Sequence, residues 1–284
     1  MNYKTKLFFI KFIPVHSWRH NLRHKVKDAY NKNMNITEQP VVAEQAPVVE
    51  QHVVQPQPDR LDKYQGYKPA SNGCEMQQFV DWVNNFSTLV VKNIFEIGAN
   101  FAQDAEYLAL KFGVEPENVY VFEAHPDIYR AITKIHKFNA YNYAVFNKNT
   151  ELTFNILPIT ESNTGLSSIL TRNDKNTVPI TLPAIRMDAF MNEHNISKID
   201  FLKLDVEGCN WEVLDGFGDR LKDINAIHVE AEHQPIYNEG KHFFEDIKEL
   251  LLANNFEMVY FQRSITQSDS FWIQKKFLKK IIIK

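Results

Sequence analysis

The sequence predicts an α/β protein with a doubly wound, mostly parallel sheet and helices on both faces. From residue 74 onward, short apolar runs rich in β-branched and aromatic residues alternate with segments of helical periodicity. Strand–helix repetition over so long a stretch is typical of a parallel sheet covered by helices. The chain has 284 residues, of which 44% are hydrophobic and 13% aromatic, so it can bury a sizeable core.

The expected elements follow one another in chain order. Met76, Phe79, Val83 and Phe86 share one face at helical spacing and indicate the first helix. Pro126 suits the first turn of a later helix, where its missing N–H is not needed. Two apolar runs close together near the C-terminus predict a final strand pair. Strands are expected at 92–98, 118–124, 141–146, 151–157, 178–186, 198–205, 226–232, 256–262 and 270–276, and the other helices at 101–112, 126–138, 187–194, 209–215 and 241–254.

Two segments precede the predicted domain, which we place at residues 74–284. Residues 36–60 repeat Val-Val, Gln and Pro with no glycine, no aromatic residue and no helical period. Residues 31–73 are therefore predicted to form an extended or disordered linker. Residues 1–30 hold seven Lys and Arg against one acid, interleaved with large apolar side chains, which predicts a basic amphipathic segment.

The charge distribution limits the class of partner. Residues 31–274 carry 20 Lys and Arg against 34 Asp and Glu, so we expect no nucleic-acid partner. The basic segment has two alternatives: peripheral contact with a membrane, or docking on the acidic body. Cys74 and Cys209 stand in unrelated contexts and indicate neither a disulfide framework nor a zinc site. These observations favour the cytoplasm, with the inner face of the cell membrane as the place of any membrane contact.

Acidic residues end the predicted strands. Glu96 and Glu123 close the first two, Asp205 and Glu207 follow "KIDFLKL", and Glu230 with Glu232 closes "AIHVEAE". In doubly wound sheets, ligands bind outside the carboxyl ends of the strands. A single carboxylate there would be a helix cap or a solvated charge, but four strand ends in register predict a binding edge.

The turn after the first strand contains only Gly98, in "FEIGANFAQ". A dinucleotide fingerprint needs two more glycines, and Asn100 and Gln103 stand in their places, so a nicotinamide oxidoreductase is disfavoured. Asn100 is expected to cap the following helix in a capping box with Gln103. Glu123 lies 27 residues after Glu96, where an acid that grips ribose hydroxyls is usually found. A ribose without phosphates beside acidic groups points to S-adenosylmethionine, whose sulfonium and amino groups are cationic.

Several stretches resemble, in this order, the FkbM family of S-adenosylmethionine-dependent methyltransferases. They are "IFEIGANFAQDAEYLA", "VYVFEAHP", "NAYNYAVF", "IRMDAFMNEHNISKIDFLKLDVEG", "EVLDG" and "AIHVEAE", and they span about residues 90–262. The pairing of "FEIGAN" with "IDFLKLDVEG" is the most specific element. The stretch "FAQDAEY" departs from the family pattern, which usually has another glycine and a serine or threonine there.

The resemblance implies the class I methyltransferase fold, which is Rossmann-like, and methylation of hydroxyl groups of sugars or small natural products. It also implies that Glu96, Gly98 and Asn100 line the methionine part of the cofactor. Glu123 would hold the ribose and the Asn142 region the adenine. The stretch "FIPVHSWRHNLRHK" is similar to the leading segment of some bacterial surface-glycan transferases, which favours a carbohydrate or glycoconjugate acceptor, such as a bacterial surface glycan or its precursor.

By the same resemblance, Asp205 and Glu207 lie beside the reacting centre, where one of them would be the general base. Alternatively, both acids could bind a divalent cation together with the acceptor hydroxyls, but the metal-free arrangement is favoured. His233 is a further candidate base, although a histidine near a strand is more often structural. Lys203 is expected to pair with a neighbouring carboxylate, and Cys209 to be a small core residue. The rival from another class is a membrane-tethered binding protein on a catalytically decayed methyltransferase scaffold.

Overall fold

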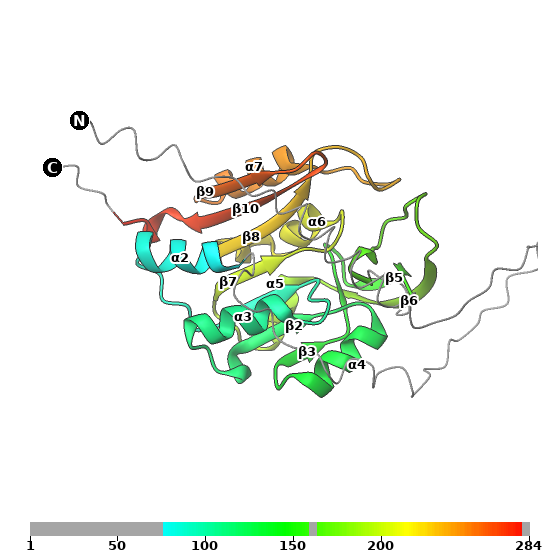
Figure 1. Cartoon of the computed structure of the whole chain (residues 1–284), viewed down its shortest axis with the longest axis horizontal. Helices are drawn as coiled ribbons and strands as arrows, with labels where there is room; N and C mark the ends of the chain where they lie inside the picture. The colour runs from blue at the N-terminus through cyan, green and yellow to red at the C-terminus, as the bar shows by residue number, and fades with distance from the viewer. Residues whose placement is uncertain (1–75, 159–163, 280–284) are drawn as a thin grey trace, which may run out of the picture. The chain divides into compact units, whose positions relative to one another are not determined.

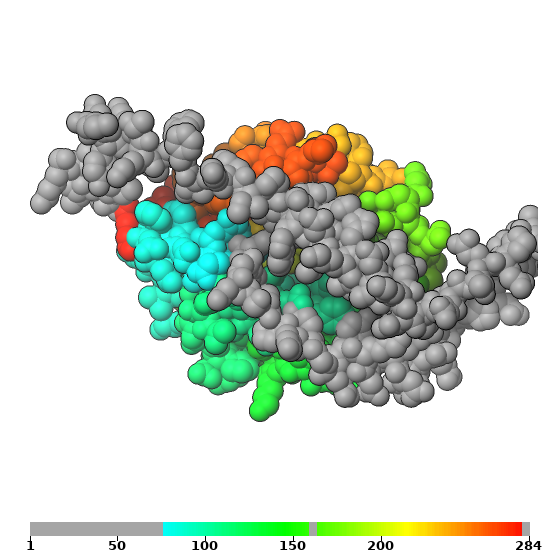
Figure 2. Space-filling model, viewed as in Figure 1, coloured from blue at the N-terminus to red at the C-terminus, as the bar shows by residue number. Residues whose placement is uncertain are grey.

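Within the described residues, a seven-stranded sheet forms the centre of the protein, in the order β3-β2-β1-β7-β8-β10-β9 (Figure 1). The computed structural model describes residues 76–158 and 164–279, which are the coloured residues of Figure 2. The predicted basic segment 1–30 and linker 31–73 lie outside the described residues. The strands are β1 (Ile94–Ile97), β2 (Val119–Phe122), β3 (Asn139–Tyr141), β7 (Ile199–Leu204), β8 (Ile224–Glu232), β9 (Phe256–Arg263) and β10 (Gln267–Gln274).

The sheet is mostly parallel, as predicted. From β3 to β8 all neighbouring strands run parallel, whereas β10 runs antiparallel to both β8 and β9. Every residue of β1, β7 and β8 is buried, because these central strands are covered on both faces. The carboxyl ends of β1, β2 and β7 therefore meet at one edge of the sheet, which positions the site.

Helices cover both faces, which confirms the doubly wound prediction. Buried side chains of α2 (Gln77–Phe86), α3 (Gln103–Phe112) and α4 (Pro126–Ile135) share one core with the sheet. Those of α5 (Met187–Glu193), α6 (Asn210–Asp215) and α7 (Phe244–Ala253) share the core on the other face. None of the described helices is long and apolar enough to cross a membrane.

Residues 144–185 contain a small second sheet, in the order β4-β6-β5. Its strands are β4 (Ala144–Val145), β5 (Thr150–Ile156) and β6 (Val178–Ile185). The single strand predicted at 141–146 is wrong, since its residues are divided between β3 and β4, which belong to different sheets. The chain leaves β3 at Asn142, whose side-chain amide donates to the carbonyls of Glu123 and Ala124 at 2.8 and 3.0 Å.

Candidate active site

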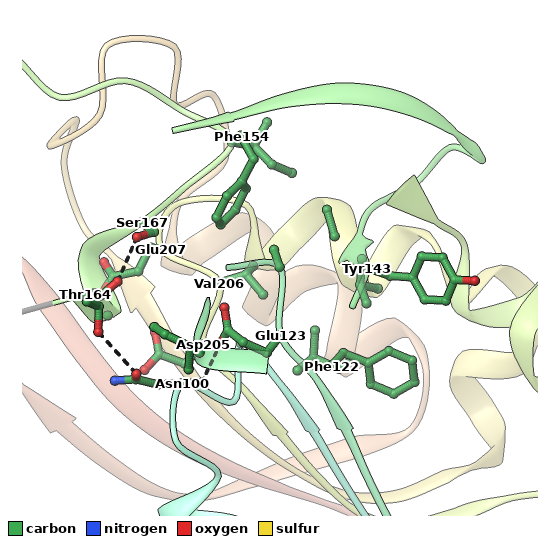
Figure 3. Close-up of a pocket in the computed structure, with 18 residues that line it drawn as sticks. Asn100, Phe122, Glu123, Tyr143, Phe154, Thr164, Ser167, Asp205, Val206 and Glu207 are labelled. Carbon is green, nitrogen blue, oxygen red and sulfur yellow. Dashed lines mark hydrogen bonds between the residues drawn. The ribbon is translucent and has the colours of Figure 1, made fainter. Parts of the chain in front are cut away.

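A pocket opens at the carboxyl ends of β1, β2 and β7, beneath the small sheet and the segment 164–169 (Figure 3). It contains about 520 Å³ of space, including the solvent at its mouth. In Figure 3, Glu123, Asp205 and Glu207 surround this space, and Phe154 points into it from above. The lining consists of Ile97, Gly98, Asn100, Phe122, Glu123, Ala124, Ile128, Tyr143, Ala144, Val145, Phe154, Thr164, Gly165, Ser167, Ile169, Asp205, Val206 and Glu207.

Gly98 makes the sharp turn at the end of β1, with a φ of 77°. A Cβ at this position would lie 1.8 Å from the carbonyl oxygen of Asp205, far inside any tolerable contact. The two strand ends are close because the Asp205 N–H donates to the Ile97 carbonyl at 3.0 Å. The protein's own backbone therefore requires glycine here, before any ligand is considered.

Asn100 does not cap α3, so the predicted capping box is wrong. The helix begins only at Gln103, after Asn100 and Ala102 adopt left-handed conformations with φ values of 47° and 56°. The Asn100 N–H instead donates to Oε2 of Glu123 at 2.6 Å. Its side-chain oxygen accepts from the Thr164 hydroxyl at 3.4 Å, so Asn100 joins two walls of the pocket.

Glu96 lies beneath the pocket and outside its lining. Its side chain is 1% exposed and accepts from the Ala105 N–H in the first turn of α3 at 3.0 Å. Burial raises the pKa of Glu96 to about 8, against the lowering effect of the Lys203 ammonium 3.5 Å away. The carboxyl group therefore supplies a cap for α3 that the local sequence around the helix does not.

Glu123 reaches the pocket with both carboxylate oxygens bound to backbone amides. Oε2 accepts from Asn100, and Oε1 accepts from the His125 N–H at 2.7 Å. Burial raises the pKa of Glu123 to about 7, although these two hydrogen bonds oppose the shift. Asn142 lies just behind Glu123, outside the lining, and its neighbour Tyr143 belongs to the lining.

Asp205 follows β7 and lines the pocket beside Gly98. The ammonium of Lys203 lies 3.4 Å from Asp205, 3.5 Å from Glu96 and 3.6 Å from Asp104. The prediction that Lys203 pairs with a carboxylate is confirmed. This buried lysine is therefore a compact positive centre at the base of an otherwise acidic edge.

Glu207 lies in a strained turn between β7 and α6. It adopts a φ of 55°, and the following Gly208 a φ of 95°. Burial and the nearby Asp205 charge raise the pKa of Glu207 to about 8. The Tyr237 hydroxyl donates to Oε2 of Glu207, and the Ser168 hydroxyl donates to its carbonyl at 2.6 Å.

Asn210 holds the same turn from inside the protein. Its side-chain oxygen accepts from the Val206 N–H at 3.0 Å, and its amide donates to the Glu230 carbonyl at 2.8 Å. Asn210 is 2% exposed, so both polar ends of its amide are satisfied within the core. Sequence reasoning missed Asn210, although an asparagine directly after the acidic turn was a usable signal.

The other candidates at the end of β8 lie outside the lining. The His233 ring packs against Phe244 and Phe261, on α7 and β9. Glu232 is buried near Asp205, and burial raises its pKa to about 7. Cys209 is a buried core residue, as predicted.

In the part of the chain that the structure describes, the potential ligand residues are not grouped into a metal site. Among these residues, no group of three or more His, Cys, Asp or Glu is arranged to hold an ion. The lining instead contains the carboxyl groups of Glu123, Asp205 and Glu207, with no Lys or Arg among the described lining residues. Such a site suits an organic cation, while Phe154, Ile128 and other apolar lining residues suit an apolar ring.

Comparison with known proteins gives one family match. Residues 96–258 match the methyltransferase FkbM domain. No curated protein matches the chain.

Solved structures with a similar fold include a methyltransferase FkbM from Methylobacillus flagellatus KT, with 11% identity and a TM-score of 0.38; the match covers 63% of this chain and 43% of that one. TrmK from M. capricolum, in complex with S-adenosyl-homocysteine, has 10% identity and a TM-score of 0.40 and covers 72% of this chain and 70% of its own. The N-terminal domain of EvdMO1, in the presence of S-adenosyl-homocysteine and D-fucose, has 10% identity and a TM-score of 0.37, with coverages of 92% and 97%.

Proposed function

Because this chain belongs to the FkbM family of S-adenosylmethionine-dependent methyltransferases, we propose that it methylates a sugar hydroxyl, with Glu207 as the general base. The acceptor we propose is a bacterial surface glycan or its precursor. The observation that carries the assignment of the base is the position of Glu207. Glu207 lines the pocket beside Asp205, at the strand edge where a bound cofactor would present its methyl group.

The lining fits the cofactor part by part. Glu123, with both oxygens oriented by backbone amides, would accept hydrogen bonds from the ribose hydroxyls. Asp205 and Glu207 would attract the sulfonium and amino group. The apolar side chains of Ile128, Val145 and other lining residues would cover the adenine.

The cofactor supplies an electrophilic methyl group on a positively charged sulfur. The protein must hold the acceptor oxygen in line with the methyl carbon and the sulfur. The Glu207 carboxylate would take the proton of the acceptor hydroxyl as the methyl group is transferred from the bound cofactor to the acceptor oxygen, so that the O–H and S–C bonds would break while the O–C bond and a carboxyl O–H bond form. The positive charge on the sulfur of the cofactor and the negative charge on Glu207 would be neutralised together, so the transfer would add no charge to the buried site.

A hydroxyl-bearing acceptor suits the wall opposite the strand ends. Thr164 and Ser167 line this wall, and Asn100 lies across from Thr164. Hydroxyl and amide groups exchange hydrogen bonds with sugar hydroxyls in both directions. This wall and the family's chemistry support a carbohydrate acceptor.

The proposal is tested by incubating the full chain with S-adenosylmethionine labelled in its methyl group and four acceptor classes: free sugars, nucleotide sugars, lipid-linked saccharides and isolated surface glycans. We expect label in a sugar ether, identified by mass spectrometry of the methylated monosaccharide. The Glu207→Gln variant is the matched control and should show almost no transfer. Transfer only to an amine, a carboxyl group or a nucleic acid would overturn the sugar assignment while leaving the family assignment intact.

A further inference from the structure

Glu207 would need help to act as a base, because its surroundings oppose a negative charge. The charged and titratable groups around it are two further acids, Asp205 and Glu232, together with Tyr237 and the more distant Arg172. Like charges and burial favour the protonated carboxyl group, which cannot accept a proton. A donor aimed at the ionised form would counter this effect.

Tyr237 supplies that donor from a loop that follows β8, 30 residues further along the chain. The side chain is only 2% exposed, and its hydroxyl donates to Oε2 of Glu207. Its ring also covers the turn, since a Cβ at Gly208 would lie 2.6 Å from ring carbon Cδ2. Tyr237 therefore contacts both residues that carry the left-handed backbone.

Tyr237 is itself held by hydrogen bonds between its loop and the segment that follows the lining residues 164–169. Both carboxylate oxygens of Glu239 accept from Thr171, at 2.9 Å from the N–H and 2.7 Å from the hydroxyl. The Asn238 N–H donates to the Thr171 carbonyl at 3.0 Å. The guanidinium of Arg172 lies over the Tyr237 ring, 5.4 Å from its centre. The phenol is thus fixed from a second side.

We propose that Tyr237 is a positioning residue for proton transfer: its hydrogen bond occupies Oε2 of Glu207 and leaves Oε1 free to receive the acceptor proton. This inference rests on the proposed role of Glu207. In the reaction, the acceptor O–H bond breaks, the proton binds Oε1, and the phenol O–H remains intact. The same hydrogen bond stabilises the ionised carboxylate before the reaction, so more of the enzyme is competent at neutral pH.

The test is the Tyr237→Phe variant, which keeps the ring over Gly208 and removes only the hydroxyl. Loss of a hydrogen bond to a charged carboxylate is expected to raise its pKa by about one unit or more. We therefore expect the rise of kcat with pH to move upward by about one unit, with activity at pH 7 about tenfold lower and largely restored at high pH. At high pH, where Glu207 is ionised in both proteins, the apparent affinity for S-adenosylmethionine should change little. Tyr260→Phe, which loses a hydroxyl bonded to Gln262 on β9, is the control and should keep the wild-type profile.

A second readout does not depend on the acceptor. In infrared difference spectra of protein labelled with ¹³C-carboxyl glutamate, the band absent from Glu207→Gln reports the ionisation of Glu207. Its midpoint should be higher in Tyr237→Phe than in wild type, even if no sugar is methylated. An unchanged midpoint, or a loss of activity by the same factor at every pH in a folded variant, would overturn the positioning role. A shifted midpoint with an active Glu207→Gln variant would instead overturn Glu207 as the base.

Discussion

Glu123 and Glu207 lie on either side of β1 in the same pocket, and they are held in different ways. Glu123 is fixed by two backbone N–H groups, from Asn100 and His125. Glu207 is held by the hydroxyl of Tyr237, in a turn with left-handed backbone and beside another acid. Two backbone donors hold both oxygens of Glu123 in place. A single side-chain donor holds one oxygen of Glu207 and leaves the other available to bind a proton. We therefore propose that Glu123 binds the cofactor and that Glu207 takes part in proton transfer.

The largest effects are expected when each carboxylate is neutralised in turn, which tests whether Glu123 and Glu207 have different roles. Glu207→Gln should lower turnover by about 100- to 10,000-fold, the usual effect of losing a general base, whereas its cofactor affinity should fall by no more than about a few-fold. Glu123→Gln should raise the cofactor dissociation constant and retain most of the turnover at saturating cofactor. Calorimetry of cofactor binding and initial rates on the same preparations measure both effects.

Asp205→Asn is the matched variant on the Glu207 side. If Asp205 only attracts the sulfonium, its loss should weaken cofactor binding more than it slows transfer. Turnover within a few-fold of wild type in both Glu207→Gln and Asp205→Asn would show that neither acid is the base, and Glu230, Glu232 and His233 would then be tested.

The end of β1 requires glycine at position 98 because another strand end lies against it. In Gly98→Ala the new Cβ would lie 1.8 Å from the Asp205 carbonyl oxygen, and backbone cannot give way as a flexible side chain can. We expect a loss of about 4 kcal/mol or more in the free energy of unfolding, or failure to fold. Urea unfolding followed by circular dichroism measures it.

Gly113→Ala is the control for this substitution. Gly113 has a similar φ of 66° at the end of α3, but a Cβ there would meet nothing within 4 Å. Only the backbone strain of about 1 kcal/mol should appear. Equal losses in the two variants would mean that the contact with Asp205 does not set the need for glycine at position 98.

The parts of the fold set by periodicity could be predicted from the sequence. The buried strands β2 and β7 and the acids that follow them, Glu123 and Asp205, could be predicted from mostly apolar runs that end at a carboxylate. The run 141–146 could not be divided correctly, because its apolar pattern does not reveal that Asn142 turns back to bind two carbonyls of the neighbouring strand end.

The hydrogen bonds that hold the site together could not be predicted from the sequence, because they join residues from distant parts of the chain. Asn100 and Gln103 have the spacing of a capping box, but the helix receives its hydrogen bond from Glu96 on the preceding strand. The hydroxyl on Glu207 comes from Tyr237, on a loop with no motif around it. Such contacts depend on how distant loops meet, and no short pattern in the chain reports them.

A smaller effect is expected when the Glu123 side chain is removed. Glu123→Ala should lower S-adenosylmethionine affinity about tenfold or more, because a charge-assisted hydrogen bond is worth about 1.5 to 3 kcal/mol. Glu117→Ala, at an exposed position just before β2, is the control and should bind normally. Wild-type affinity in a folded Glu123→Ala protein would contradict the proposed role of Glu123 in cofactor binding.

The smallest expected effect is a pH dependence that separates S-adenosylmethionine from S-adenosylhomocysteine. The pKa values of Glu123 and Glu207 are raised to about 7 and about 8, so both carboxyl groups are largely protonated at pH 6. A bound sulfonium favours their ionised forms, so binding the cation must release protons at low pH. Affinity for S-adenosylmethionine should therefore rise from pH 6 and level off above pH 8. S-adenosylhomocysteine has no charge on sulfur and should show a shallower rise.

The measured quantity is the ratio of the two affinities, which removes effects of pH that both ligands share. We expect this ratio to increase a few-fold, up to about tenfold, between pH 6 and pH 8.5. In Glu207→Gln the increase should be smaller, since one of the two titrating groups is gone, and the remaining part should belong to Glu123. A ratio that is constant with pH in the wild type would mean that the sulfonium does not change the ionisation of Glu123 and Glu207. The proposed attraction between these carboxylates and the cofactor would then be wrong.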